Sequence, residues 1–267
     1  MTTKQYPLAH GMGAIPAIGL GTWQSRDAVK HALQSGYKDI DTALNCGNEK
    51  AVGEGICDSG IPSEDIWVTT KLNNHWHHHV AEVLDSSLAN LGLDYVALYL
   101  VHFPCSTDPG YRSKHLENRD FVRTWQEMQK LLGTGTVRNI GLSNFQVTHL
   151  KLLLSDPSYK VIPAVNQIEL QPYNPSDSPI NGQTNILHDP IVLRIAGPWK
   201  KTPAQIVLMW NLQRGVGVIP KSVTPARIED NFALDGWALT EEVLDEISAI
   251  KTRAKVLDIC KTTYLKA

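Results

Sequence analysis

The sequence lacks long apolar runs, a charge excess and a leader-like start. Its 25 Lys and Arg face 27 Asp and Glu, a formal net charge of −2, so no strong field attracts a phosphate backbone or an anionic membrane. The longest apolar run, 96–101, stops at His102, far short of the ~18 residues of a membrane span. The first ten residues hold one lysine and no apolar stretch, so no secretory signal is expected. Nucleic-acid and membrane partners are disfavoured, and a cytoplasmic location is expected.

Cysteine and glycine motifs are also missing. The four cysteines are scattered and form no C-x-x-C pair, which disfavours a zinc site or a disulfide framework and predicts reduced thiols. No G-x-G-x-x-G motif occurs, and Lys221-Ser222 lacks the glycine that precedes a P-loop lysine. A Rossmann or P-loop nucleotide site is therefore excluded.

A histidine cluster at 75–79 is the one hint of a metal. His75 and His79 share a helical face, but no carboxylate stands with them at ligand spacing. We therefore expect no metal site, because zinc sites need three or four placed ligands. A metal-dependent barrel hydrolase built on this cluster remains the weaker alternative.

Short apolar runs do alternate with longer helical patterns, which indicates βα units around a parallel sheet. Strands are expected at 18–21, 38–41, 66–70, 96–101, 137–142, 164–170 and 216–220. Helices are expected at 26–35, 49–57, 79–91, 119–132, 146–154 and 203–213, with others beginning at Pro190 and Thr240. No linker or repeat divides the 267 residues, so we predict a single domain, 1–267, that opens with a hairpin over 8–17.

One segment breaks this alternation. Residues 171–189 read QPYNPSDSPINGQTNILHD, with four prolines or glycines and no run of strand length. An eight-fold barrel needs a full helix and a seventh strand between Leu170 and Pro203, and the sequence has no room for them. The predicted fold class is therefore α/β, a TIM (β/α)8-type barrel incomplete around its seventh strand.

Polar residues follow most of the predicted strands. In a parallel barrel the carboxyl ends of the strands meet at one mouth, and here they carry Asp41-Thr42, Lys71, His102, Ser143-Asn144, Asn166, Gln167 and Lys221-Ser222. An Asp, a Lys and a His on successive strand ends can handle a proton, or can form a structural salt bridge with a capping His. Spacing alone leaves both readings open.

Several motifs together resemble the aldo-keto reductase family. They are IGLGTW at 18–23, GYKDIDTALNCGNEKAVGEGI at 36–56, VTTKL at 68–72, LYLVHFP at 98–104, GLSNF at 141–145, NQIELQPY at 166–173 and IPKSVTPARIEDNF at 219–232. The likeness covers nearly the whole chain in the right order. It implies a barrel enzyme that uses NADP(H), without a metal, to interconvert small carbonyl compounds and alcohols.

The resemblance implies that Asp41, Lys71 and His102 are catalytic. The fourth catalytic residue of the family is a Tyr whose hydroxyl, with its pKa lowered by the Lys, protonates the carbonyl oxygen; here Cys46 stands at that position. Its sulfur lies one bond beyond Cβ, short of a phenol oxygen, and a misplacement of ~1 Å can cost ~100-fold in rate. A thiol near Lys71 is also predicted to tend toward thiolate.

A second departure from the family follows Pro175. Family members carry there a helix and a strand ending in A-Y-S-P-L-G, whose Tyr stacks on the nicotinamide, and nothing in 174–189 matches it. The expected function is an NADP-dependent oxidoreductase of impaired activity. The alternative is an inactive relative that binds NADPH or serves as an interaction protein.

The resemblance also implies the binding residues. Those for NADP are Thr22, Asp41, Ser143, Asn144, Gln167, Lys221, Ser222, Val223, Arg227 and Asn231. Of these, Lys221, Ser222 and Arg227 would hold the 2′-phosphate, since cations and a hydroxyl at a helix start suit a dianion. The substrate pocket would include Trp23, Phe103 and His102, and its aromatic residues suggest an apolar lining.

Overall fold

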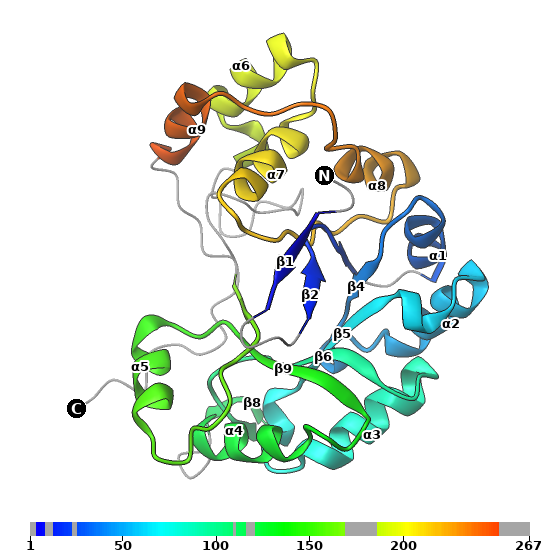
Figure 1. Cartoon of the computed structure of the whole chain (residues 1–267), viewed down its shortest axis with the longest axis vertical. Helices are drawn as coiled ribbons and strands as arrows, with labels where there is room; N and C mark the ends of the chain where they lie inside the picture. Colours follow the sequence, from blue (N-terminus) through cyan, green and yellow to red (C-terminus); the bar gives the residue numbers. More distant parts are fainter. Residues whose placement is uncertain are drawn as a thin grey trace.

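A six-stranded parallel sheet forms the centre of the molecule (Figure 1). The computed structural model describes residues 4–8, 13–22, 26–108, 111–115 (backbone only), 121–168 and 186–250. The strands lie in the order β10-β9-β6-β5-β4-β3. Neighbours in the sheet therefore follow one another in the same order as along the chain. They are β3 (Leu20–Gly21), β4 (Asp39–Asp41), β5 (Trp67–Leu72), β6 (Val96–Val101), β9 (Val137–Ser143) and β10 (Asn166–Gln167).

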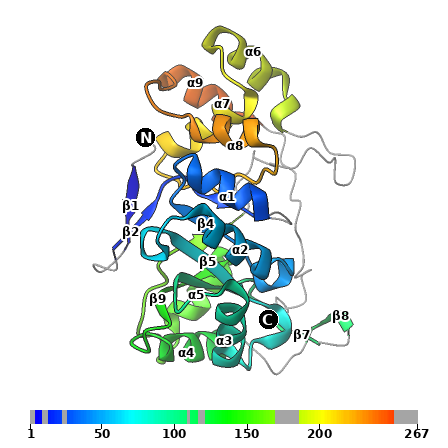
Figure 2. The ribbon, with the colours of Figure 1, turned by 90° about the vertical axis from the view of Figure 1, so that its right-hand side faces the viewer.

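Helices cover the outer face of this sheet (Figure 2). They are α1 (Arg26–Gln34), α2 (Glu49–Ser59), α3 (Val80–Leu91), α4 (Phe121–Lys130) and α5 (Val147–Ser155). Alternate strand residues such as Ile40, Val68 and Tyr99 join the core between sheet and helices. Because strand side chains alternate in direction, Asp39, Asp41, Thr69 and Lys71 face the inside of the curved sheet.

Close helix packing depends on two glycines of α2. A Cβ at Gly53 would meet the Leu91 carbonyl oxygen at 2.1 Å, and one at Gly55 would meet the Arg26 carbonyl oxygen at 2.5 Å. No side chain fits at either distance, so α2 lies directly against the C-terminal end of α3 and the start of α1. This packing fixes the segment between β4 and α2, which carries Cys46.

The seventh predicted strand, 216–220, is present only as isolated bridges. Ile18 pairs with Val218 and Gly21 with Lys221, both in the parallel sense, and the Gly19 amide donates to the Val218 carbonyl at 2.9 Å. In the described part of the chain, no pairing joins this segment to β10. The sheet is thus a curved, incomplete TIM-type barrel, as the sequence predicted, and among the described residues it has an open seam between β10 and 218–221.

Four further helices gather at one end of the molecule (Figure 1). They are α6 (Pro190–Trp199), α7 (Pro203–Gln213), α8 (Pro225–Phe232) and α9 (Glu241–Ser248). Helix α7 begins with a capping box in which the Thr202 hydroxyl accepts from the Gln205 amide and the Gln205 side chain accepts from the Thr202 amide. No helix among those described has the length and apolar character that a bilayer crossing requires.

Apart from the strand 216–220, the predicted helices and strands of the described residues occur in the structure, with some differences in their bounds. The N-terminal hairpin pairs β1 (Gln5–Pro7) with β2 (Ala14–Pro16), and its tip at 9–12 lies outside the described residues. The expected strands 18–21 and 164–170 were too long, since β3 spans two residues and β10 is described over two. A second hairpin, β7 (Thr107–Asp108) with β8 (Tyr111–His115), was missed. Most of the irregular segment 171–189 also lies outside the described residues.

Candidate active site

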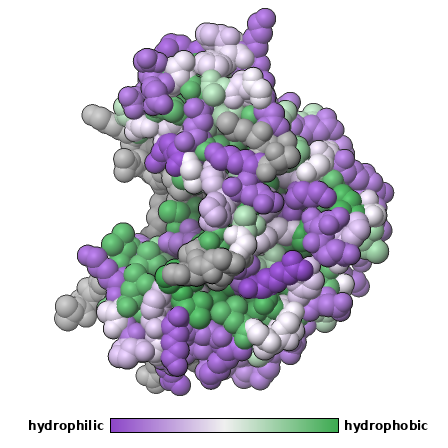
Figure 3. All heavy atoms as spheres, viewed as in Figure 1, coloured by the Kyte–Doolittle hydropathy of each residue, from purple (hydrophilic) through white to green (hydrophobic). Residues whose placement is uncertain are grey.

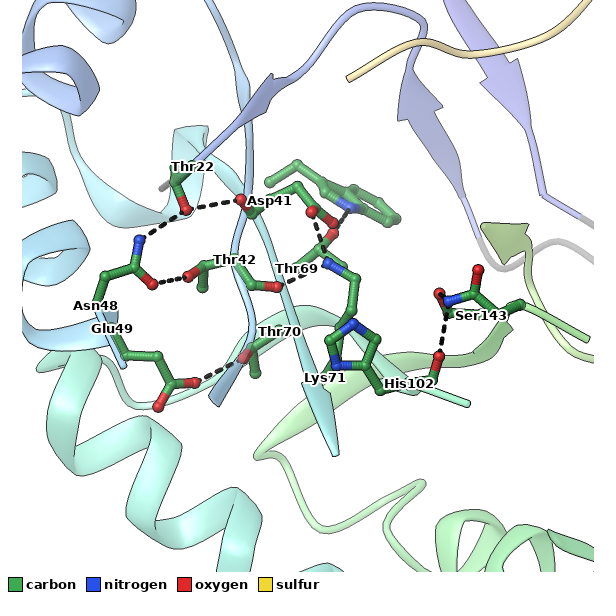
Figure 4. A network of polar contacts seen from close by, with 12 residues as sticks. Thr22, Asp41, Thr42, Asn48, Glu49, Thr69, Thr70, Lys71, His102 and Ser143 are labelled. Carbon is green, nitrogen blue, oxygen red and sulfur yellow. Dashed lines mark hydrogen bonds and ion pairs between the residues drawn. The ribbon is translucent and has the colours of Figure 1, made fainter. Parts of the chain in front are cut away.

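A buried ion pair occupies the carboxyl ends of β4 and β5 (Figure 4). Lys71 Nζ donates to Asp41 Oδ1 at 2.6 Å and to the Thr42 carbonyl at 2.8 Å. The two side chains are only 6% and 11% exposed. Removing charges from water is unfavourable unless they are paired and hydrogen-bonded, and here both conditions hold.

A chain of hydroxyl and amide groups holds the strand end that carries Asp41. Thr22 Oγ1 donates to the Asp41 carbonyl at 2.9 Å, Asn48 Nδ2 donates to Thr22 Oγ1 at 3.3 Å, and Thr42 Oγ1 donates to Asn48 Oδ1 at 3.0 Å. The predicted nicotinamide contact Thr22 is therefore part of this network. It links the ends of β3 and β4 to the start of α2.

His102 follows β6, the next strand of the sheet. Burial, with the charge of Lys71 and then His77 adding to it, lowers the pKa of His102 from 6.5 to about 3. The imidazole is therefore neutral at neutral pH, and its buried Nδ1 has no hydrogen-bond partner among the described residues. Its ring stacks on Phe103 with the centroids 4.9 Å apart.

Asn144 connects His102 to the next strands. Its Nδ2 donates to the His102 carbonyl at 3.0 Å and to Ser143 Oγ at 3.1 Å, while its amide donates to the Gln167 carbonyl at 2.9 Å. The backbone φ of Asn144 is 62°, a left-handed conformation that Asn tolerates better than most residues. The structure thus brings the predicted residues Ser143, Asn144 and Gln167 together beside His102.

Cys46 lies in a 3-10 turn, Leu44–Cys46, and its side chain is partly buried. Burial is the largest influence on the Cys46 thiol and raises its pKa; the charge of Lys71 lowers it, the carboxylates of Asp41 and Glu49 raise it, and the net shift is upward. The expectation that this thiol tends toward thiolate is wrong. Cys46 is a protonated, weakly acidic thiol at neutral pH.

Sequence reasoning missed Asp39, which shares the inner face of β4 with Asp41. Asp39 is 2% exposed, and its Oδ1 has no hydrogen-bond partner in the described structure. A Cβ at Gly19 would lie 2.3 Å from Asp39 Oδ2, so this carboxyl fits only because residue 19 is glycine. Burial, followed by the nearby charge of Asp41, raises the pKa of Asp39 well above its ordinary value. The sequence DID at 39–41 offered a signal, because two carboxyl residues separated by one position in a strand point to the same face.

The residues predicted for the adenosine end of NADP lie just before α8, in its first turn (Arg227) and near its end (Asn231). Lys221, Val223 and Arg227 are exposed, whereas Ser222 and Asn231 are buried. Ser222 Oγ accepts from the Thr224 amide at 3.1 Å, and the Thr224 side chain makes no cap to α8. The bridge from Lys221 to Gly21 places this cluster next to Thr22. Exposed cations at a helix N-terminus suit a phosphate.

The aromatic pocket residues are only partly placed. Trp23 lies outside the described residues, and Phe103 is 3% exposed, so its ring supports His102 and does not line an open rim. Trp76, which is 39% exposed, lies near the rings of His78 and His79.

The histidine cluster is engaged in other contacts. His75 Nδ1 lies 2.8 Å from Thr107 Oγ1, and His77 Nδ1 lies 3.3 Å from Ser106 Oγ. A carboxylate that the spacing argument overlooked, Glu82, lies 2.8 Å from His79. Even so, no group of three or more His, Cys, Asp or Glu suited to a metal occurs in the part of the chain described here.

The thiols differ from one another. Cys46 and Cys57 are free, whereas Cys105 is disulfide-bonded. The expectation of reduced thiols throughout is therefore wrong for Cys105.

Comparison with known proteins gives one consistent result. The sequence profile of the Aldo/keto reductase family matches residues 17–181. The chain is 40% identical over 282 residues to glycerol 2-dehydrogenase (NADP(+)) of Saccharomyces cerevisiae, covering 91% of this chain and 90% of that protein. It is 36% identical over 258 residues to methylglyoxal reductase DkgA of Escherichia coli K12, covering 88% of this chain and 90% of that protein.

A solved structure agrees with these relatives. The crystal structure of the Bombyx mori aldo-keto reductase in complex with NADP superposes with a TM-score of 0.88 at 32% identity, covering 97% of this chain and 96% of that one.

Proposed function

The chain belongs to the aldo/keto reductase family, and we propose that it uses NADP(H) to interconvert a small aldehyde or ketone and its alcohol, at a rate impaired by Cys46 and the incomplete barrel. One observation carries this proposal. The buried Asp41–Lys71 pair, 2.6 Å apart, lies at the strand ends beside the neutral His102. A cytoplasmic location and a single domain over 1–267 stay predictions.

The residues present fit an NADP(H) molecule at two places. Lys221 and Arg227, exposed beside the uncapped start of α8, would hold the 2′-phosphate, and Asn231 would face the adenine. Thr22, Ser143, Asn144 and Gln167 would hold the nicotinamide, although the Asn144 amide group is already bonded to His102 and Ser143. When bound, the cofactor supplies or accepts the hydride.

The protein's own groups then act on the substrate oxygen. The positive charge of Lys71, kept out of water and held by Asp41, stabilises the negative charge that develops on that oxygen. His102, neutral at neutral pH, orients the carbonyl through a ring nitrogen. Because Asp41 and Asn144 fix the positions of Lys71 and the His102 backbone, these groups need little rearrangement during the reaction.

Two observations support the proposed impairment. The side chain of Cys46 is short and its thiol is weakly acidic, whereas a well-positioned acid raises the reaction rate by about 10² to 10⁴-fold. The alignment to the yeast dehydrogenase extends over 282 positions, more than the 267 residues of the chain, so that relative has residues without a counterpart here. A helix and a strand missing after Pro175 would account for such extra residues and for the seam beside β10 in the described part of the chain.

The test combines binding with turnover. Fluorescence titration with NADPH and NADH should show at least a tenfold preference for NADPH, and reduction of 4-nitrobenzaldehyde should be measurable but well below the ordinary enzyme range of about 1 to 10³ per second. Equal affinities would contradict the cofactor assignment. NADPH binding without any reduction would favour the second candidate, an inactive relative that binds NADPH. The observation that favours this candidate is Cys46 at the position of the family's catalytic Tyr.

A further inference from the structure

We infer that Phe103, anchored by hydrogen bonds of the segment 105–107 that follows it, positions the His102 ring toward the substrate oxygen. The inference rests on the proposed function, because it concerns how the imidazole of that reaction is aimed. It gives Phe103 a positioning role in place of the pocket role that the family resemblance implied.

The His102 ring lacks the usual means of orientation. An imidazole that acts in a reaction is commonly aimed by a hydrogen bond to its second ring nitrogen. In His102 the Nδ1 atom is buried and has no hydrogen-bond partner among the described residues. The backbone is held, since its amide donates to the Leu72 carbonyl at 3.3 Å and its carbonyl accepts from Asn144 Nδ2 at 3.0 Å. These two bonds fix the point from which the side chain starts and leave the rotation of the ring to its packing.

Phe103 supplies this packing. Its ring stacks on the His102 ring, with the centroids 4.9 Å apart and the planes inclined by 27°. Phe103 is only 3% exposed, so its ring has little room to swing away. The next residue, Pro104, has a fixed φ, which stiffens the short path from Phe103 to Cys105. The direction of the His102 ring therefore depends on where the segment 105–107 is held.

Three side-chain hydrogen bonds hold the segment 105–107 against the segment 74–77. They run from Asn74 Nδ2 to Cys105 Sγ at 3.4 Å, between His77 Nδ1 and Ser106 Oγ at 3.3 Å, and between His75 Nδ1 and Thr107 Oγ1 at 2.8 Å. We call these six residues the clasp. All of them except His75 are at most 7% exposed, so water competes little for their hydrogen bonds.

The clasp joins the ends of two neighbouring strands. The segment 74–77 follows β5, which carries Lys71, and the segment 105–107 follows β6 and His102. The clasp also lies close to the imidazole: after burial and the charge of Lys71, the charge of His77 is the next cause that lowers the pKa of His102. Loosening the clasp should therefore change how His102 is aimed relative to Lys71.

The mutational test weakens the support of His102 at two points. The double variant Ser106→Ala/Thr107→Val removes two of the three bonds of the clasp, and Phe103→Leu removes the stacked ring but keeps an apolar side chain. Because a misplacement of ~1 Å can cost ~100-fold in rate, we expect each to lower kcat for 4-nitrobenzaldehyde by about tenfold or more. NADPH binding should stay within a factor of about two of the wild type, since these residues are outside the cofactor set.

Two controls separate hydrogen bonding from packing. Thr107→Ser removes a methyl group and keeps the hydroxyl that bonds to His75, so it should retain at least about half of the wild-type kcat. Ser158→Ala removes a bond of similar length, 2.8 Å from Gln126 Nε2, in the outer layer of the molecule, and should leave kcat unchanged. A kcat of the double variant or of Phe103→Leu equal to that of the wild type would overturn the inference.

A second measurement does not depend on turnover. In protein labelled with ¹⁵N-histidine, the ring nitrogens of His102, identified by their loss in His102→Gln, should give one sharp set of signals in the wild type and in Ser158→Ala. In the double variant and in Phe103→Leu these signals should broaden or split, because the ring takes more than one orientation. A clasp that only stabilises the fold would lower the free energy of unfolding in urea without changing the His102 signals, and that result would overturn the inference.

The possible results separate the two proposals. A wild type that reduces the aldehyde, with His102 signals that are unchanged in both variants, would overturn only the inference about Phe103. A wild type that neither binds NADPH nor reduces the aldehyde would overturn the proposed function. The His102 signals would then still decide whether Phe103 and the clasp hold the ring.

Discussion

Lys71 Nζ lies 2.6 Å from Asp41 Oδ1, although the two residues are 30 positions apart in the sequence. Another pair in the same chain, Lys130 and Glu127, has the same 2.6 Å separation but side chains that are 69% and 46% exposed. Equal distances therefore come with very different burial, and the two pairs should respond differently to loss of a partner.

Asp41→Asn should destabilise the protein by about 3 to 5 kcal/mol, because it leaves the Lys71 ammonium buried without a counter-charge. Glu127→Gln, the matched exposed control, should change the unfolding free energy by at most about 1 kcal/mol. Urea unfolding of the wild type and both variants measures this. Similar losses in the two variants would show that burial does not govern the Asp41–Lys71 pair.

Lys221→Gln should weaken NADPH binding at least tenfold and leave NADH binding within a factor of about two, because only NADPH carries the phosphate that this cation would meet; charge-assisted contacts contribute about 1.5 to 3 kcal/mol. Lys50→Gln, an exposed lysine on α2, should change neither. Fluorescence titrations of the three proteins at one fixed salt concentration decide the matter. An equal loss for both cofactors would remove Lys221 from the phosphate site.

His102→Gln should flatten the acid dependence of stability. The folded pKa of His102, about 3, lies below its ordinary 6.5, so its contribution is present above pH 6.5 and is lost as the pH falls toward 3. At ~1.4 kcal/mol per pH unit, the wild type should lose about 3 kcal/mol more than the variant between pH 7 and pH 4. Unfolding free energies at both pH values, with His79→Gln as a half-exposed control, test this. Parallel losses would contradict a buried neutral imidazole.

Asp39→Asn should stabilise the protein at neutral pH. Burial raises the folded pKa of Asp39 well above 3.8, so its contribution is present below pH 3.8 and is lost as the pH rises through the folded pKa. Asparagine does not ionise, so the variant should exceed the wild type by a margin that grows by up to ~1.4 kcal/mol per pH unit above pH 4. Thermal or urea unfolding across this pH range measures the margin. Asp65→Asn, at an exposed residue, is the control, and its margin over the wild type should not grow with pH. A pH-independent margin would mean that Asp39 ionises normally.

Cys46→Tyr alone should restore little activity, whereas the same change combined with a complete helix and strand inserted after Pro175 should restore much more. An acid accelerates only a substrate that is already positioned, and the open seam leaves β10 without a second neighbour among the described strands. Steady-state rates for the single change, the insertion and the combination form a double-mutant cycle. Full activity from Cys46→Tyr alone would refute the claim that a barrel unit is functionally missing.

The cluster at the strand ends could be predicted because parallel strands bring their carboxyl ends to one edge. Asp41 ends the predicted strand 38–41, and Lys71 and His102 directly follow the predicted strands 66–70 and 96–101; the structure places the three together. The irregular composition of 171–189 likewise predicted an incomplete barrel, and the strands of the described residues confirm it.

The protonation states could not be predicted. The family resemblance implies that Cys46 lies near Lys71, but the direction of its pKa shift depends on burial, on the opposing charge of Lys71 and on two carboxylates from other elements. The hairpin of β7 and β8 was missed for a different reason. Its strand residues, TD and YRSKH, are polar and short, without the apolar alternation that marks a half-buried strand.

The seam between β10 and 218–221 also affects how the molecule moves. A strand inside the sheet leaves only if hydrogen bonds on both of its sides break, whereas in the described structure β10 is bonded on one side and residues 218–221 are held through two bridges to Ile18 and Gly21. Local opening, and with it amide hydrogen exchange, should therefore start at these two edges. Gln167 and Lys221 lie on the two opposite edges of the seam. A ligand that contacts both residues would therefore suppress local opening at both edges and hold them together, although no new strand forms.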